Sequence, residues 1–333
     1  MKAVSVRLRG LVDFLSGSGA VYALLVLIFA VILVRDISFA EPSSLLSFAK
    51  KAAPLIVLAV GQYLVIVSGE LDLSVGSLVG FQVVLAALLI DGQEARTVPV
   101  LLVMFAFGAF VGLVNGLITT LLKVPSIITT LGTMLILFGA IRLLTGGAPT
   151  GALSEGFRAA GRRGIELPWI GLVPWSLPII VALGFGAAAL MRSSYGRTLM
   201  AVGDNDRAAG LSGVRVWRTR TLAFVMSGVL ATAAAVLIGG FAGVTAQVGE
   251  GKEFVAITAV VLGGVVLGGG RGAVVAAIAG AVTVEALFTL FNQLSLPSTI
   301  RPAAQGLIII AAVGYAARAR VRRPSLPVPR PTT

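Results

Sequence analysis

Apolar runs long enough to cross a membrane recur along almost the whole sequence, separated by short polar segments. A helix that spans a bilayer needs roughly 20 mostly apolar residues. Hydrophobic residues make up 57% of the chain and charged residues 12%, about half the charged share of soluble domains. The pattern predicts an all-α, polytopic membrane protein with about ten transmembrane helices.

The predicted helices follow the positions of these runs: residues 17–34, 54–67, 75–90, 98–121, 124–145, 169–191, 221–241, 254–269, 272–291 and 301–317. The first is either a retained anchor or a signal peptide cleaved near Ala40, and its long apolar run favours the anchor. The second and third are short and are separated by the polar residues 68–74, so one of them is a candidate for a broken or incomplete span. Within the fourth, Gly108, Gly112 and Gly116 lie on one face and predict close packing against another helix.

The most basic interruption, residues 191–221, orients the chain in the membrane. Against two acids, Asp204 and Asp206, it holds the arginines Arg192, Arg197, Arg207, Arg215, Arg218 and Arg220. Because Lys and Arg concentrate in cytoplasmic loops, this segment is predicted to lie in the cytoplasm. An even number of crossings then places both termini there, and the segments assigned to that side hold most of the Lys and Arg residues.

A single membrane domain is predicted for residues 1–317, with a cytoplasmic loop over residues 192–220 and a basic, proline-rich, disordered tail over residues 318–333. The two halves are predicted to form an inverted repeat. Residues 124–126 (VPS), before the fifth helix, resemble residues 296–298 (LPS), before the tenth, on the opposite side of the membrane. A second similarity, between residues 69–76 and 263–270, fits no common repeat and is interpreted as a coincidence of glycines.

Composition excludes several kinds of chemistry. With no cysteine and no histidine, the chain has no disulfides, thiol catalysis or histidine proton relays, and no metal site is predicted. The net charge is +12. We interpret it as a topology signal and as contact with the lipid membrane rather than as nucleic-acid binding, because the basic patches alternate with apolar runs.

Polar side chains at membrane depth are costly unless they face protein, a partner or water. Amides and hydroxyls both donate and accept hydrogen bonds, which suits a hydroxyl-rich solute such as a sugar. For each residue two interpretations are open: a place on the translocation path, or an interhelical hydrogen bond that holds the bundle. The candidates are Gln62, Gln82, Asn115, Thr129, Thr130, Thr133, Thr283 and Gln305, with Glu70 and Asp72 near a helix end.

Few ionisable groups lie well inside the predicted helices. Arg142 and Glu285 do, and they are candidates to pair with each other. An ion-driven carrier needs carboxylates at mid-membrane, so their scarcity indicates an energy source outside the chain. The sequence also lacks a G-x-x-x-x-G-K-[ST] nucleotide loop, so a separate protein is predicted to supply the energy. The alternatives are a stand-alone carrier driven by an ion gradient and a membrane enzyme; the latter is weak, because only Glu70 and Asp72 are close together.

Four segments, in order, carry distinctive motifs: residues 68–77, 124–134, 195–214 and 253–272. Together they resemble the motifs of one family, the membrane permeases of bacterial ATP-binding-cassette (ABC) sugar importers of the ribose, xylose, arabinose and galactose group. Residues 68–77 (SGELDLSVGS) are similar to its G-G-I-D-L-S-V-G-S signature, and residues 124–134 (VPSIITTLGTM) to its P-F-I-x-T-L-G-T-M segment. Residues 195–214 and 253–272 are similar to two further motifs of that family. The likeness covers residues 45–317.

The resemblance implies a non-enzymatic permease of the bacterial inner membrane, homodimeric or pseudo-symmetric, that imports a monosaccharide or similar polyol. A soluble sugar-binding protein would deliver the substrate, and separate cytoplasmic ATPase subunits would use ATP and Mg²⁺, with no cofactor bound by this chain. The implied coupling residues are Gly203, Asp204, Asn205, Ala208, Ala209, Gly210 and Ser212. Asp204 or Asn205 is suited to cap a short coupling helix there. Glu70 and the pair Val265-Val266 depart from the family pattern, so no particular sugar is implied.

Overall fold

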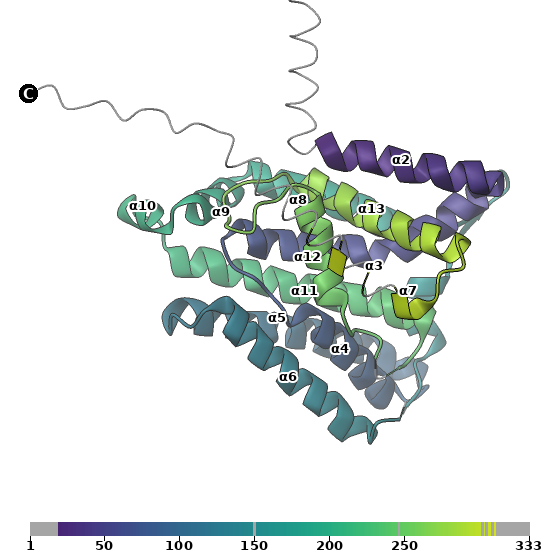
Figure 1. The fold of residues 1–333 in the computed structure, drawn as a ribbon. Helices are drawn as coiled ribbons and strands as arrows, with labels where there is room; N and C mark the ends of the chain where they lie inside the picture. Colours follow the sequence, from purple (N-terminus) through teal and green to yellow (C-terminus); the bar gives the residue numbers. More distant parts are fainter. Residues whose placement is uncertain are drawn as a thin grey trace, which may run out of the picture.

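The computed structural model describes residues 19–148, 151–245 and 247–300, with the isolated positions 303, 306, 307 and 310. Helices dominate this part of the chain (Figure 1), which confirms the predicted all-α class. They are α2 (Gly19–Arg35), α3 (Pro42–Val67), α4 (Val75–Ile90), α5 (Thr97–Leu121), α6 (Ser126–Thr145), α7 (Glu155–Arg162), α8 (Ser176–Arg192), α9 (Ser194–Asp204), α10 (Asp206–Leu211), α11 (Val216–Ala242), α12 (Lys252–Leu262) and α13 (Val274–Gln293).

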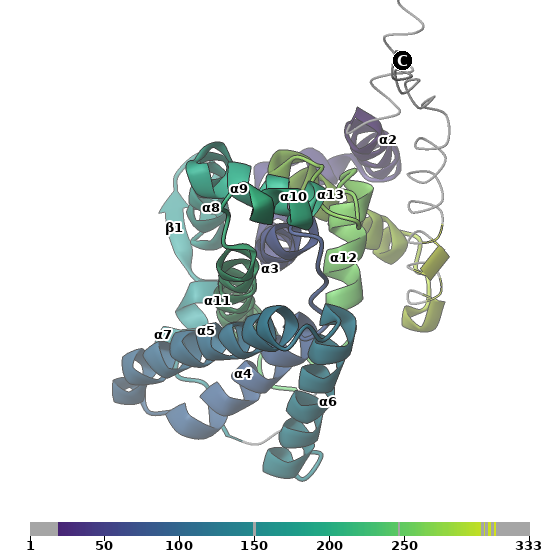
Figure 2. The same cartoon turned by 90° about the vertical axis from the view of Figure 1, so that its left-hand side faces the viewer.

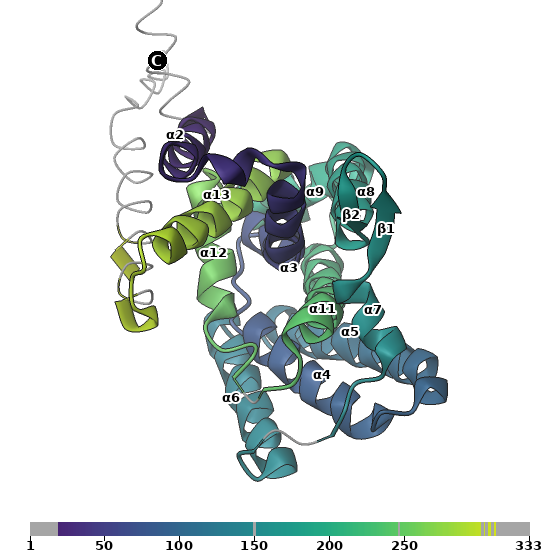
Figure 3. The same ribbon diagram turned by 90° about the vertical axis from the view of Figure 1, so that its right-hand side faces the viewer.

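Three short 3₁₀ turns, Ile37–Ala40, Glu94–Arg96 and Ser298–Ile300, complete the helical elements of the described residues. A small antiparallel hairpin of β1 (Gly164–Leu167) and β2 (Gly171–Pro174) was not predicted. It contacts α8 and α3, and Figure 3 shows it on the side of the bundle beside α8. Its formation explains why α8 begins at Ser176, later than the predicted start of the sixth helix.

Helix α11 lies between α3 and α5 in the middle of the bundle (Figure 2) and packs against both. The most apolar part of α3 is 89% buried, whereas that of α6 is only 22% buried. A helix that is apolar all round and buried belongs to the core of the bundle, and an exposed apolar helix faces lipid or another protein chain. The core therefore forms around α3 and α11, and α6 lies at its edge.

Glycines allow α5 and α11 to approach backbone to backbone. A Cβ at Gly112 would overlap the Phe224 carbonyl, and one at Gly116 would crowd Thr221. Gly108 and Gly228 meet in the same way, one turn further along. The close packing predicted from the four-residue spacing of these glycines is confirmed, and the partner is α11.

Within the described residues, five helices are long and apolar enough to cross a membrane: α5, counted from Glu94, and α3, α6, α11 and α13. A sixth is possible if α8 and α9, which are bent by 70°, form one broken span. Helices α2 and α4 are apolar but shorter. The predicted tenth helix, residues 301–317, and the tail, residues 318–333, lie outside the described residues or at their scattered edge, so the helix count and the inverted repeat stay predictions.

Two helices differ in length from their predictions, for physical reasons. α3 begins at Pro42 rather than at residue 54, because Pro42 fits the first turn of a helix and the interior Pro54 is tolerated there. Lys50 and Lys51 interrupt the apolar run, so the sequence pattern does not indicate this extension. α12 ends at Leu262, and its C-cap is Gly263, so the glycine-rich residues 263–272 form a loop instead of the end of a helix.

Candidate coupling site and polar network

The basic segment is mainly helical. α9 is capped by Ser193, and α10 by Asn205, whose Oδ1 accepts a hydrogen bond of 2.9 Å from the backbone N–H of Ala208. Of the two capping residues predicted, Asn205 is therefore the cap, while Asp204 ends α9. Figure 1 shows α10 projecting from one end of the bundle.

The predicted coupling residues divide between an exposed and a packed set. Asp204, Asn205, Ala208, Gly210 and Ser212 are exposed. Ala209 is 7% exposed and so faces the protein, which leaves Ala208 as the exposed alanine of the pair. A short helix with an exposed polar and small-residue surface is suited to enter a groove of a partner.

Gly203 lies in a junction of three chain segments. A Cβ at Gly203 would overlap the Val67 carbonyl oxygen and the Gly270 nitrogen, and Gly270 N–H donates a 2.9 Å hydrogen bond to that same carbonyl. Gly269, with φ of +83°, lies against Gly69, with φ of +91°. Gly69 and Gly269 belong to the two similar segments 69–76 and 263–270, and the structure brings them into contact. The end of α3, the end of α9 and the loop before α13 come together at this point.

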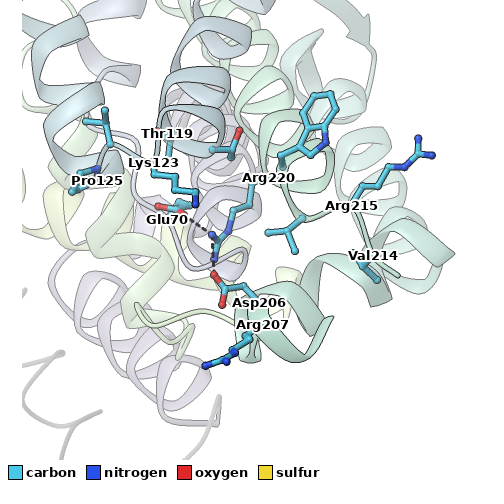
Figure 4. A pocket seen from close by; sticks show the side chains of 13 residues that line it. Glu70, Thr119, Lys123, Pro125, Asp206, Arg207, Val214, Arg215 and Arg220 are labelled. Carbon is cyan, nitrogen blue, oxygen red and sulfur yellow. Dashed lines mark ion pairs between the residues drawn. The ribbon is translucent and has the colours of Figure 1, made fainter. Parts of the chain in front are cut away.

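Arg220, in the second turn of α11, connects this region to α10. Its Nη1 lies 3.1 Å from Glu70 Oε1 and 3.3 Å from Asp206 Oδ2, and its Nε donates a 3.1 Å hydrogen bond to the Ser68 carbonyl. Figure 4 shows its side chain reaching toward both acids. The contacts join α10 and α11 to the chain that follows α3.

A cavity of about 650 Å³ adjoins these ion pairs. It separates α10 and the start of α11 from the turn between α5 and α6, which supplies Lys123 and Pro125 (Figure 4). Arg207 and Arg215 line it from the opposite side. We call the end of the bundle that carries α10, this cavity and the glycine junction the coupling end.

Residues 68–74, which we call the break, are not helical and connect α3 to α4. Backbone N–H groups that are buried need partners. Leu71 N–H donates to Ser126 Oγ at 3.1 Å and Leu73 N–H to Thr130 Oγ1 at 3.0 Å. Hydroxyls of α6 therefore replace the missing helical hydrogen bonds. The break lies between α3 and α4, each of which is continuous, and the bent pair among the described helices is α8 with α9, so a broken span here stays a prediction.

Asp72 is the centre of a buried hydrogen-bond network. The carboxylate is 2% exposed and accepts from Ser74 N–H at 2.9 Å, from Ser74 Oγ at 2.6 Å and from Ser227 Oγ at 3.1 Å. Asn115 Nδ2 donates to Ser74 Oγ at 3.0 Å, and Thr133 Oγ1 donates to Asn115 Oδ1 at 2.6 Å. The break, α5, α6 and α11 are joined by this one network.

Of the remaining path candidates, Thr129 meets the network only through its backbone carbonyl, which accepts from Thr133 Oγ1 at 3.2 Å, and Gln62, Gln82 and Thr283 have no hydrogen bond to it among the described residues. Gln82 Nε2 donates to Thr232 Oγ1 at 2.7 Å, and Thr283 bonds within its own helix. Gln62 is fully buried, and neither its amide nor Thr129 Oγ1 has a hydrogen-bond partner in the described part of the chain. Gln305 lies outside the described residues. The structure thus brings together Glu70, Asp72, Asn115, Thr130 and Thr133 only.

Arg142 and Glu285 line different cavities. Arg142 faces a cavity of about 750 Å³ with Gln247 and Glu250. Glu285 lines a cavity of about 110 Å³ together with Lys51 and Lys252. The structure gives no support to the pairing of Arg142 with Glu285.

Arg220, Ser126 and Ser227 are functional candidates that the sequence did not single out. In the sequence, Arg220 contributes only to the basic segment that predicts the topology, because the seventh helix is predicted to begin at residue 221. α11 begins at Val216, which places Arg220 on a helix. A charged residue at the start of a long apolar run is the signal that points to it.

Comparison with known proteins gives one matching family. A model described as the permease component of branched-chain amino acid transport systems matches residues 44–313. The autoinducer 2 import system permease protein of Enterobacter sp. (strain 638) is 35% identical over 267 residues, which cover 80% of this chain and 76% of the relative. The galactose/methyl galactoside import permease protein of Escherichia coli (strain K12) is 32% identical over 289 residues, covering 82% and 85%. No solved structure matches.

Proposed function

From the premise that this chain belongs to the family of permease components of branched-chain amino acid transport systems, we propose that it is the membrane subunit of an ABC importer. The chain supplies the translocation path and the docking site, and a separate cytoplasmic ATPase supplies the energy from ATP and Mg²⁺. The two import permeases to which it is similar support this function over a stand-alone carrier driven by an ion gradient.

The substrate that we propose is a monosaccharide or a similar polyol. One relative is named for the import of galactose and methyl galactoside, and another for autoinducer 2. The polar side chains around the break are carboxylate, amide and hydroxyl groups, which together donate and accept hydrogen bonds. Asp72, Ser74 and Asn115 are buried and bonded to one another in this structure, so the proposal of a hydroxyl-rich solute rests mainly on the names of the two relatives.

The partners follow from this function. A soluble binding protein delivers the solute at the end opposite the coupling end, and the ATPase binds at the coupling end. Two copies of the chain form the path between them, and the poorly buried α6 supports an interface there, since its apolar surface is otherwise uncovered. We place the protein in the bacterial inner membrane with both termini in the cytoplasm, on the side of the basic coupling end.

The proposal rests on α10, an exposed helix whose Asp206 is ion-paired with Arg220 of α11. Arg220 also pairs with Glu70 in the break. ATP hydrolysis in a partner can move this chain only if the partner binds an element that also contacts the translocation path. Within the described residues, α10 is exposed to a partner and is ion-paired with Arg220, which also contacts the break.

Replacing Ala208 with arginine is expected to reduce copurification with the neighbouring ATPase at least about tenfold, because a desolvated, unpaired charge at an interface costs several kcal/mol. Ala208 is exposed, so the fold and the membrane insertion should not change. The measurement is the amount of ATPase retained by the affinity-tagged chain in detergent.

The matched control is Ala95→Arg, an exposed alanine in the 3₁₀ turn Glu94–Arg96, which should retain the ATPase fully. Equal retention by the Ala208→Arg and Ala95→Arg variants would contradict docking at α10.

The substrate itself is best identified from the ligands of the binding protein encoded beside this chain.

A further inference from the structure

We infer that Arg220 is a positioning residue that transmits movement of α10 to the break and, through the break, to α6. The inference rests on the proposed function, because it assumes that an ATPase moves α10. It concerns three successive contacts: α10 with Arg220, Arg220 with the break, and the break with α6.

The first two contacts share one guanidinium group. Arg220 Nη1 lies between Asp206, the first residue of α10, and Glu70 in the break. The side chains of Arg220 and Glu70 are 18% and 14% exposed, against 54% for Asp206. Water and salt screen exposed ion pairs more than partly buried ones, so the contact with Glu70 is the stronger of the two. The planar guanidinium also donates to the Ser68 carbonyl through Nε, so its fixed fork reaches three acceptors, whereas a lysine ammonium is a single point charge on a flexible stem.

The third contact runs through side-chain hydroxyls. The break donates its Leu71 and Leu73 N–H groups to Ser126 and Thr130 of α6. Asp72 continues the connection through Ser74 and Asn115 to Thr133, also on α6. The N–H groups of residues 68–70 still bond to carbonyls in the last turn of α3, whereas those of Leu71 and Leu73 are held by side chains of α6. A shift of Glu70 is therefore passed to α6.

The cavity near Arg220 favours a connection between α10 and α6 through Arg220 over direct packing of α10 on the turn before α6. About 650 Å³ of open space lies between α10 and the turn that leads into α6 (Figure 4). Direct packing between these two elements is thus replaced by the ion pairs. The glycine junction at Gly203 also holds α9 to α3 through backbone atoms, including the hydrogen bond from Gly270 N–H to the Val67 carbonyl, so the fold does not depend on Arg220 alone.

The experiment uses the absence of cysteine in the chain. A single cysteine is introduced at Ile136, which is 72% exposed on α6 in the single chain and belongs to the surface proposed to meet the second copy. It is labelled with an environment-sensitive fluorophore, and dimer formation by the labelled chain is checked first. The complete complex with its ATPase is trapped with ATP and vanadate. We expect a fluorescence change with Arg220 present, and a change at least about fivefold smaller in the Arg220→Gln variant, the low end of coupling between distant sites. Copurification of the ATPase should be retained.

Three further variants separate positioning from simple structural support. Arg271→Gln removes the exposed pair of Arg271 with Asp204, 3.7 Å apart at the same end, and should leave the α6 response intact. Arg220→Lys should give an intermediate response. Glu70→Gln combined with Arg220→Gln leaves no buried charge unpaired and should still lack the response, even if the single variant folds poorly.

The outcomes distinguish the two proposals. Failure of the ATPase to copurify with the otherwise unchanged chain would contradict the proposed function, and this inference with it. If the complex forms but α6 responds fully in the Arg220→Gln variant or in the double variant, Arg220 does not transmit the movement, and the docking function stands.

Discussion

Replacing Gly203 with alanine is expected to destabilise the protein by roughly 3 kcal/mol, the upper end of the usual cost of overpacking. The added methyl group would overlap the Val67 carbonyl oxygen and the Gly270 nitrogen. Both are backbone atoms, so no side-chain rotation relieves the overlap. The hydrogen bond from Gly270 to Val67 would break or lengthen, and α9 would separate from α3. Because α10 follows directly, ATPase binding should fall as well.

Gly210→Ala is the matched control. It adds the same methyl group within α10, where the nearest atom, Val216 Cγ2, is 4.0 Å away. Since alanine favours a helix over glycine by about 1 kcal/mol, this variant should be as stable as the parent or more stable. The measurement is the thermal unfolding midpoint of the purified chain in detergent. A midpoint for Gly203→Ala equal to that of Gly210→Ala would show that the junction tolerates a side chain.

Much of the helical architecture could be predicted from the sequence, because each spanning segment must bury its own backbone polar groups in lipid and therefore needs a long apolar run. α5 and α6 illustrate this, since both begin and end within a few residues of their predicted limits. The start of α3 was missed because Lys50 and Lys51 interrupt the apolar run, although charges near a helix end are tolerated where they reach the interface. The hairpin of β1 and β2 was missed because two strands of four residues carry too short a pattern.

The site was predictable only where it depends on local sequence. Asn205 could be expected to cap a helix because a cap acts over three residues. The contact of Arg220 with Glu70 joins residues far apart in the chain, and nothing in the spacing of the two predicts it. The glycine junction has the same character: the sequence points to Gly203 only through a family motif and to Gly69 and Gly269 only through a local similarity, and nothing in their spacing predicts that the three segments pack together.

Replacing Asp72 with alanine is expected to destabilise the protein by at least about 3 kcal/mol, because each buried donor left unpaired costs about 1–3 kcal/mol. Three donors lose their acceptor: Ser74 N–H, Ser74 Oγ and Ser227 Oγ. The break should then detach from α11, and the trapped complex should lose the response of the label on α6. The measurements are the unfolding midpoint in detergent and that fluorescence change.

Asp72→Asn tests whether the negative charge itself is needed. The amide oxygen accepts both bonds from Ser74, and the amide nitrogen donates to Ser227 Oγ, so every contact has a counterpart. We expect a stability within about 1 kcal/mol of the parent, as for other exchanges that leave no buried donor unpaired. An ATP-driven permease has no need of a charge at this position, whereas an ion-coupled carrier uses buried carboxylates to bind its ion. If Asp72→Asn instead abolished the ATP-dependent response of α6 while leaving the fold intact, the carboxylate would have a role in transport that hydrogen bonding does not explain.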